Sequence, residues 1–321
     1  MIEDEDSGAQ ALWIQAPGRA VLRPATARPA GAGEVRVRAL TSGISRGTES
    51  LVFHGKVPPS EWQRMRCPWQ EGEFPFPVKY GYAIVGVTED GERVLCLHPH
   101  QSRFTVSADA VLAVPSHIPS ERAVLAPQLE TAINATWDAG PRAGDRIAVV
   151  GGGVIGSLVA YLCARSPGAE VTLIDSNPAR QELAAAFGVG FAQPGGALPA
   201  DCDLVFHATG RADGLNLALS LAGFEATVVE LSWYGTEPVS AEFGGAFHSR
   251  RLSLRSSQVG AIPAERRGRW DFRRRLALAL GLTADPALDL LVQDETPFEH
   301  IPALLPTILG APGPLFHRIR Y

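Results

Sequence analysis

Residues 146–157 read RIAVVGGGVIGS, a run of β-branched residues that ends in a glycine-rich turn. The run predicts a buried strand, and the periodicity of the residues from 154 onward predicts a helix directly after it. Gly151, Gly153 and Gly156 form the pattern G-x-G-x-x-G in the strand–turn–helix context of a dinucleotide-binding fingerprint. The first glycine permits a tight turn, the second lets a pyrophosphate approach the helix N-terminus, and the third lets the helix pack on the strand.

An acidic residue follows at the spacing that this fingerprint requires. Asp175 ends the next expected strand, EVTLID, nineteen residues after Gly156. A carboxylate there can bond the ribose hydroxyls of NAD and repel the 2′-phosphate of NADP. Ser176 and Asn177 come next, with no adjacent arginine. The sequence therefore predicts NAD as the cofactor, against the alternative of a glycine-rich turn that binds nothing.

The segments on either side of this motif differ in their pattern. From about residue 145, strands alternate with helices through NPARQELAAAFG, DLVFHATG, LNLALSLAG and EATVVELS, which predicts a parallel sheet covered by helices. Residues 10–125 instead contain short alternating runs broken by Gly, Pro and Asp, as in a small β-barrel or sandwich. A chain of 321 residues is long enough for both domains.

Composition narrows the class of protein. Hydrophobic residues make up 45% and charged residues 20%, and the net charge of −5 gives no reason to expect nucleic acid as a partner. No signal peptide or membrane span is expected, and the four scattered cysteines form no C-x-x-C pair. We expect a cytoplasmic protein that acts on a small molecule, without a membrane partner, and we expect a homodimer.

Three stretches resemble the medium-chain dehydrogenase/reductase superfamily over nearly the whole chain. PRAGDRIAVVGGGVIG opens its nucleotide domain, TSGISRGTESLVFHG looks like its first active-site stretch, and VKYGYAIVG looks like its second. The motif GISRGTE is similar to that of a subgroup that includes dehydrogenases of hydroxyethyl side chains in bacteriochlorophyll synthesis. The resemblance implies a GroES-like β-barrel catalytic domain at residues 1–126, completed by 258–321, and a Rossmann domain at 127–257.

The same resemblance implies that the catalytic zinc of many members is missing. Ser45 and Arg46 stand near the family's cysteine ligand, and Tyr82 stands at its histidine ligand. The third ligand position falls on Ala126 or Pro127, neither of which binds metal, and the cysteine-rich lobe of structural-zinc members is absent. Because thiolate and imidazole are the ligands that zinc prefers, we expect no metal.

Without zinc, a side chain must stabilise the alkoxide that forms during hydride transfer. Tyr82 is the first candidate because a phenol can donate a proton, and the other catalytic candidates are Thr48, Glu49, Arg46 and Glu130. Tyr80, two residues away on the same face of an extended strand, is expected to shape the substrate pocket together with Trp233 and Tyr234. The alternative interpretation of Trp233 and Tyr234, which lie in ELSWYGTEPV, is that they pad the domain interface.

The residues expected to hold the cofactor are Gly151, Gly153, Val154, Ile155, Gly156, Asp175, Arg180, Ala208, Thr209, Leu231 and Ser232.

Two further features have competing interpretations. In CLHPH, Cys96, His98 and His100 share a face of a regular strand, which suits either a metal or ordinary packing. Nine arginines lie between Arg250 and Arg275, which suits either a solvated surface or a cradle for an anionic substrate.

The sequence thus predicts a zinc-independent NAD-dependent oxidoreductase that transfers hydride between nicotinamide and an alcohol or ketone, which could be anionic. A quinone or enone reductase of the zinc-free branch is one alternative. A catalytically degenerate NAD-binding sensor or scaffold is another.

Overall fold

The computed structural model describes residues 8–310 and 315–321. The chain divides into two compact units. The first unit runs to Pro127 and resumes over Leu280–Tyr321, and the second comprises Gln128–Ala279. The first change of unit lies within one residue of the predicted boundary. The second differs from it, because residues 258–279 pack with the second unit.

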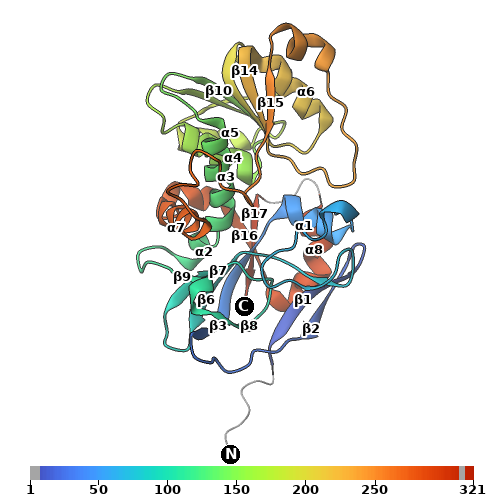
Figure 1. The fold of residues 1–321 in the computed structure, drawn as a ribbon, viewed down its shortest axis with the longest axis vertical. Helices are drawn as coiled ribbons and strands as arrows, with labels where there is room; N and C mark the ends of the chain where they lie inside the picture. Colours follow the sequence, from blue (N-terminus) through green and yellow to red (C-terminus); the bar gives the residue numbers. More distant parts are fainter. Residues whose placement is uncertain (1–7, 311–314) are drawn as a thin grey trace, which may run out of the picture. The chain divides into compact units, whose positions relative to one another are not determined.

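A six-stranded parallel sheet, with the strand order β12-β11-β10-β13-β14-β15, forms the centre of the second unit (Figure 1). This is the 3-2-1-4-5-6 order of a doubly wound Rossmann sheet, so the predicted fold of this unit is confirmed. The strands are β10 (Arg146–Val150), β11 (Glu170–Ile174), β12 (Gly190–Ala192), β13 (Cys202–His207), β14 (Ala222–Glu230) and β15 (Ser253–Ser256).

Helices cover this sheet because each strand exposes an apolar face that must be buried. Helix α4 connects β10 to β11, and helix α6 connects β13 to β14, in the opposite direction along the sheet. Because such crossovers are right-handed, the two helices cover opposite faces of the sheet. Leu215 and Leu219 of α6 pack on buried Val205 and Val228 of the sheet. The helices associated with this unit are α3 (Ala126–Ala139), α4 (Val154–Cys163), α5 (Arg180–Phe187), α6 (Ala212–Leu221), the π-helix η3 (Phe243–Phe247) and α7 (Phe272–Leu282).

The first unit contains a seven-stranded sheet and a four-stranded sheet, and it matches the predicted small β-barrel domain. The larger sheet has the order β16-β17-β3-β6-β7-β9, with β8 paired to β3, and the smaller has the order β2-β1-β5-β4. The strands are β1 (Gln10–Ala16), β2 (Arg19–Pro24), β3 (Glu34–Ile44), β4 (Glu71–Gly72), β5 (Val78–Lys79), β6 (Ile84–Thr88), β7 (Arg93–Cys96), β8 (Arg103–Ser107), β9 (Val111–Ala113), β16 (Val292–Pro297) and β17 (Phe316–Arg320). The helices are α1 (Arg46–Phe53), η1 (Pro59–Glu61), η2 (Ala108–Ala110), α2 (Ser120–Ala123), η4 (Pro286–Leu291), η5 (Phe298–His300) and α8 (Ile301–Leu309).

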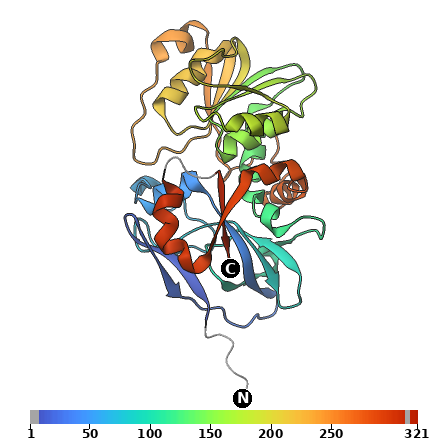
Figure 2. The ribbon, with the colours of Figure 1, turned by 180° about the vertical axis from the view of Figure 1, so that it is seen from behind.

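The last part of the chain completes this unit. Strand β17 pairs antiparallel with β3, where His317 lies opposite Ile44 (Figures 1 and 2). Helix α8 packs near α1, and the Arg46 guanidinium donates hydrogen bonds to the carbonyl oxygens of Ile308 and Gly310 at 3.0 and 2.7 Å. Arg46 therefore holds two segments of the unit together.

The stretch VKYGYAIVG does not form one continuous strand, so that expectation was wrong. Strand β5 ends at Lys79 and β6 begins at Ile84. Gly81 has a φ of +123°, and a Cβ there would meet the His100 ring at 2.8 Å. The bend at this glycine interrupts the ladder. Within residues 8–310 and 315–321, no helix is long and apolar enough to cross a bilayer.

Candidate functional site

The glycine-rich turn has the geometry that its spacing predicts. Gly151 has a φ of +111°, and a Cβ there would meet the backbone of Ala208 at 2.8 Å. A Cβ on Gly156 would lie 1.9 Å from the Gly151 carbonyl oxygen, whereas one on Gly153 would meet nothing within 4 Å. Two glycines are thus required by close packing. The third keeps the approach to helix α4 open.

Helix α4 begins at this opening. Gly153 is its N-cap residue and supplies no side-chain hydrogen bond to the first turn. The amide groups of that turn, which include Val154 and Ile155, therefore have donors available for an anion, and the helix dipole favours negative charge there. The arrangement fits the pyrophosphate of a dinucleotide.

A cavity of about 490 Å³ lies at the carboxyl ends of β10, β11 and β13. Five residues predicted to hold the cofactor line it: Gly151, Gly153, Asp175, Ala208 and Thr209. It is also lined by residues that were not predicted to hold the cofactor, including Ser176, Pro194, Arg211 and Asp213. This is the edge of an open parallel sheet where ligands bind, next to the point at which the strand order reverses.

Asp175 is fixed within this cavity by backbone donors. Its Oδ2 accepts a hydrogen bond from the Gly152 amide at 2.6 Å, and its Oδ1 accepts one from the Asn177 amide at 2.8 Å. Arg180 lies close by, because a Cβ on Gly152 would be 3.1 Å from the Asp175 Cβ and 3.2 Å from the Arg180 Cγ. No arginine is adjacent to Asp175 in the sequence, although Arg180 was predicted to hold the cofactor. The first turn of α5 supplies one.

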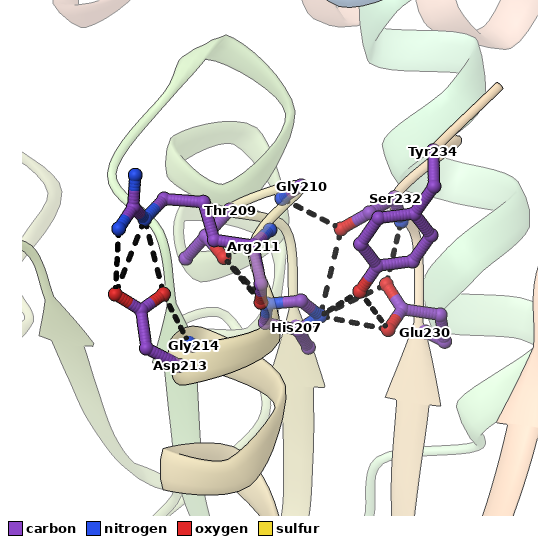
Figure 3. A network of polar contacts seen from close by, with 9 residues as sticks. All are labelled: His207, Thr209, Gly210, Arg211, Asp213, Gly214, Glu230, Ser232 and Tyr234. Atoms are coloured by element: carbon purple, nitrogen blue, oxygen red, sulfur yellow. Dashed lines mark hydrogen bonds and ion pairs between the residues drawn. The ribbon is translucent and has the colours of Figure 1, made fainter. Parts of the chain in front are cut away.

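A partly buried polar network occupies the carboxyl ends of the neighbouring strands β13 and β14 (Figure 3). His207 and Glu230 are its centre, with the imidazole Nδ1 at 2.9 and 2.8 Å from the two carboxylate oxygens. Thr209, Ser232 and Tyr234, all named from the sequence, hydrogen bond to this pair. Neither His207 nor Glu230 was predicted from the sequence as a site residue. Leu231 is tied to it through its amide, which donates to the His207 carbonyl oxygen at 2.9 Å.

Tyr82 lies in the first unit with the hydroxyl groups of α1 and its N-cap. Its phenol is hydrogen bonded to the side chains of Ser45 and Thr48. Burial raises the pKa of Tyr82 to about 12, although these hydrogen bonds oppose the shift. The phenol therefore keeps its proton at neutral pH, as a donor to a developing oxyanion must.

Glu49 belongs to a second buried network next to Tyr82. Its Oε1 accepts from the Ser45 amide at 2.7 Å, and its Oε2 lies 3.0 Å from Nε2 of His100. The other ring nitrogen of His100 is 2.8 Å from the Ser42 hydroxyl, which is 3.0 Å from the Tyr321 hydroxyl. Ser42 and Tyr321 carried no signal in the sequence, because β17 brings the latter beside β3 from the far end of the chain.

The remaining candidates have packing partners of their own. Tyr80 is buried, its ring meets that of Tyr82 edge to face at 6.2 Å, and its hydroxyl donates to the Met65 carbonyl oxygen at 3.2 Å. Glu130 on α3 forms a buried ion pair with Arg275 at 3.0 Å. Trp233 is partly buried after β14.

The structure separates the residues of CLHPH. His100 pairs with Glu49, while His98 stacks on Phe104 at 3.8 Å and bonds the Pro99 carbonyl oxygen through Nδ1 at 2.8 Å. Burial lowers the pKa of His98 to about 3. In the described part of the chain, no group of three or more His, Cys, Asp or Glu side chains is arranged to hold a metal ion.

The arginines between residues 250 and 275 bind separate partners. Arg251 pairs with Glu225 at 2.9 Å, Arg255 with Asp138 at 3.2 Å, and Arg250 donates to the Ala222 carbonyl oxygen at 2.7 Å. Arg274 lies over the Trp270 ring at 4.0 Å. These contacts favour the interpretation of a structural and solvated surface over a single anion cradle.

Comparison with known proteins agrees with this fold. The profile of the family described as "3-hydroxyacyl-CoA dehydrogenase, NAD binding domain" matches residues 146–187. A curated relative, 2-dehydro-3-deoxy-L-galactonate 5-dehydrogenase of Pseudoalteromonas atlantica, is 28% identical over 172 residues, which is 50% of this chain and 49% of the relative. The match thus spans about half the length of that protein.

Solved structures resemble nearly the whole chain. L-idonate 5-dehydrogenase from Escherichia coli superposes with a TM-score of 0.77 at 15% identity, over 98% of each chain. 2R,3R-butanediol dehydrogenase from Bacillus subtilis gives 0.76 at 15% identity, over 98% of this chain and 100% of the other. An E. coli alcohol dehydrogenase complexed with NADH gives 0.74 at 18% identity, over 98% and 99%. These likenesses confirm the predicted GroES-like and Rossmann fold. The family profile, which describes an NAD-binding domain, supports NAD(P) as the cofactor.

Proposed function

We propose that this protein is an NAD-dependent oxidoreductase that interconverts an alcohol and a ketone. The observation that carries the proposal is the cavity at the carboxyl edge of the Rossmann sheet, where the glycine turn and Asp175 lie together. Helix α4 would hold the pyrophosphate, and Asp175 would hold the adenosine ribose. NAD, when bound, supplies the acceptor or donor of hydride.

In this proposal, the Tyr82 hydroxyl replaces zinc as the group that stabilises the developing alkoxide and exchanges a proton with it. Support comes from the hydroxyl of Tyr82, which is hydrogen bonded to Ser45. The sequence resemblance places Tyr82 at the histidine ligand of zinc-dependent enzymes and Ser45 near their cysteine ligand. The adjacent Glu49–His100 pair, with its atoms 3.0 Å apart, extends the hydrogen-bonded network around this hydroxyl. This network favours an alcohol and ketone over an enone, because enone reduction depends less on a proton relay.

The substrate class rests on the relatives alone. The curated relative and the L-idonate dehydrogenase are named for sugar acids, which carry a carboxylate. We propose an anionic polyol or sugar acid as the first class to test. The arginine-rich stretch no longer supports this choice, because its members have separate partners. The narrower resemblance to bacteriochlorophyll enzymes, the cytoplasmic location and the homodimer stay predictions.

Cofactor titration tests the proposal directly. We expect NAD⁺ to bind more tightly than NADP⁺ in calorimetric titrations, because the Asp175 carboxylate repels a 2′-phosphate. Asp175→Ser should narrow that preference to within about tenfold, since one charge interaction is removed. Arg180→Ala is the matched variant, and it should lower the affinity for NADP⁺ more than the affinity for NAD⁺. Equal or tighter binding of NADP⁺ by the unmodified protein would contradict the assignment of NAD.

Turnover is the second readout. Alcohols and ketones of neutral and anionic classes would be supplied with NAD⁺ or NADH, and nicotinamide absorbance would be followed. We expect oxidation of at least one secondary alcohol. Tight cofactor binding without turnover on any of them would instead support a sensor or scaffold.

A further inference from the structure

A second cavity lies within the first unit and shares no lining residue with the cavity at the edge of the Rossmann sheet. Its volume is about 250 Å³. The side chains that matter for the argument are those of Trp69, Gln70, Glu71, Lys79, His98 and Phe104. The indole of Trp69 belongs to a residue that is 45% exposed, whereas the amide, imidazole and phenyl groups belong to buried residues. The cavity therefore combines an aromatic rim with polar atoms beneath it.

Trp69 occupies a backbone position that favours glycine. The Gln70 amide donates to the Cys67 carbonyl oxygen at 3.2 Å, which closes a turn with Pro68 at its second position. Trp69 is at the third position and has a φ of +60°. Glycine or asparagine is usual there, because other side chains are strained at positive φ. Strain of this kind is often retained where a side chain serves a ligand.

The same turn leaves a buried donor at the cavity. Oε1 of Gln70 accepts from the Cys67 amide at 3.3 Å. This bond fixes the orientation of the side-chain amide, because a backbone N–H requires an acceptor. Nε2 of Gln70 is buried and has no hydrogen-bond partner among the residues that the structure describes. A buried N–H without a partner is costly, so this group is suited to the carbonyl oxygen of a ligand.

His98 supplies an acceptor to the same cavity. Its Nδ1 lies 2.8 Å from the Pro99 carbonyl oxygen, which can only accept, so Nδ1 carries the proton. Burial lowers the pKa of His98 to about 3, so the ring is neutral at pH 7 and Nε2 is unprotonated. Within residues 8–310 and 315–321, Nε2 has no hydrogen-bond partner.

Aromatic rings surround this acceptor. The Phe104 ring stacks on the His98 ring with centroids 3.8 Å apart and planes inclined by 10°. The Trp69 ring lies 6.4 Å from the His98 ring and is inclined to it by 28°. Flat apolar faces of this kind favour a planar ligand.

The charges at the cavity balance each other. The Lys79 side chain is 2% exposed, and its ammonium pairs with the Glu71 carboxylate and donates to Oε1 of Gln101 at 2.7 Å. The third N–H of this ammonium has no partner in the described part of the chain. Because the ion pair has no net charge and His98 is neutral, the cavity favours an uncharged ligand.

We propose that this cavity is a binding site for a small, uncharged aromatic amide. The carbonyl oxygen of the ligand would accept from Nε2 of Gln70, its N–H would donate to Nε2 of His98, and its ring would lie against Trp69. The cavity is smaller than the roughly 300 Å³ at which sites for drug-sized ligands begin, which suits a single ring. The site is independent of the proposed hydride transfer, because it shares no residue with the dinucleotide cavity.

Benzamide is the probe, and benzamidine is its matched control. The two molecules have the same shape, but benzamidine is cationic and replaces the carbonyl acceptor with a donor. Ligand-observed NMR titrations of the full chain would be made with excess NADH, which occupies the proposed nicotinamide site. We expect benzamide to bind with a dissociation constant of about 1 mM or below, and benzamidine to bind at least about tenfold less tightly.

Gln70→Glu tests the role of the buried donor. The variant keeps an acceptor for the Cys67 amide but replaces Nε2 with a carboxylate oxygen. We expect the preference to reverse, so that benzamidine binds about tenfold more tightly than benzamide. The control is Gln63→Glu, which introduces the same charge at an exposed residue that does not line the cavity. It should leave the preference unchanged.

Three results would overturn the inference. The first is no binding of benzamide up to about 20 mM, which would leave the cavity to water. The second is an unchanged preference in Gln70→Glu, and the third is an equal change in Gln63→Glu. Should Gln70→Glu not fold, Trp69→Gly decides, because glycine suits this turn position. Loss of the indole face should lower benzamide affinity about tenfold, and unchanged affinity contradicts the site.

Discussion

At the residue scale, hydrogen-bond partners distinguish two chemically identical side chains that are both buried. Tyr80 and Tyr82 both have a raised pKa, and burial is the largest cause in each case. The Tyr80 hydroxyl donates to a backbone carbonyl, whereas the Tyr82 hydroxyl bonds two side-chain hydroxyls next to the Glu49–His100 pair. A hydroxyl partner can both donate and accept, so only Tyr82 can pass a proton onward.

Tyr82→Phe should retain the fold and NAD affinity while turnover falls about a hundredfold, the usual cost of one lost oxyanion donor. Steady-state kinetics with the best substrate, together with calorimetric titration of NAD⁺, measure both quantities. Tyr80→Phe is the control. It should lower the free energy of unfolding by about 1 kcal/mol, because one buried hydrogen bond is lost, and leave turnover nearly unchanged.

The pKa of Tyr82 adds a pH dependence to this prediction. Because the pKa is raised to about 12, the donor form persists throughout the neutral and mildly alkaline range. The rate of ketone reduction should therefore not decline through ionisation of Tyr82 until about pH 11, one unit below this pKa. Below that pH, the unmodified protein and Tyr82→Phe should show the same shape of pH profile. Near-normal turnover of Tyr82→Phe would assign the phenol to packing and direct attention to Thr48 and Glu49.

At the element scale, local patterns were predictable and non-local pairings were not. The strand–helix units from Arg146 to Glu230 follow from periodicity and glycine positions that lie within a few residues of each other. The pairing of His207 with Glu230 spans 23 residues and depends on strand register, which periodicity does not encode. The break between β5 and β6 also depends on tertiary packing, since the His100 ring occupies the space beside Gly81.

The glycine turn gives an element-scale prediction with a built-in control. Gly156→Ala would place a Cβ 1.9 Å from the Gly151 carbonyl oxygen, so α4 must shift away from β10. We expect a loss of about 1–3 kcal/mol in the free energy of unfolding, as for other overpacked sites, measured by urea denaturation. The gain in helix propensity from alanine is smaller than this clash.

Gly153→Ala should behave in the opposite way. Its Cβ meets no atom within 4 Å, and its φ of −70° suits alanine, so stability should hardly change. The added methyl group points into the space where a pyrophosphate would approach, so NAD affinity should fall. Loss of stability in Gly153→Ala, or normal NAD affinity in it, would contradict the assigned roles of the two glycines.

At the scale of the whole molecule, buried polar contacts help to decide which segments of the chain belong to each unit. Residues 258–279 pack with the second unit, where Arg275 bonds Glu130 and Asn134 of α3. The sequence placed the return to the barrel domain at residue 258 because SSQVG looked like a crossing. A single arginine within a basic stretch gives no local sign that it is buried, so this boundary was not predictable from the sequence.

Metal content is the whole-molecule property that most directly tests the catalytic proposal. The protein would be dialysed against a zinc-containing buffer and then against a zinc-free buffer, and its zinc content would be measured by elemental analysis. We expect less than about 0.1 zinc per chain, whereas a structural or catalytic site would retain its metal through the second dialysis. The physical reason is that Ser45 and Tyr82, which stand where the sequence resemblance implies two zinc ligands, hydrogen bond through neutral hydroxyl groups. The resemblance puts the third position at Ala126 or Pro127, neither of which offers a ligand.

Activity should also survive a strong chelator, because the proposed proton donor is the phenol of Tyr82. The control is Glu49→Gln, which removes the buried carboxylate beside His100 and leaves Ser45 and Tyr82 in place. About one zinc per chain in the unmodified protein, lost in Glu49→Gln together with activity, would overturn zinc independence. It would identify Glu49 and His100 as metal ligands, since they form the buried carboxylate–imidazole contact of this site at 3.0 Å.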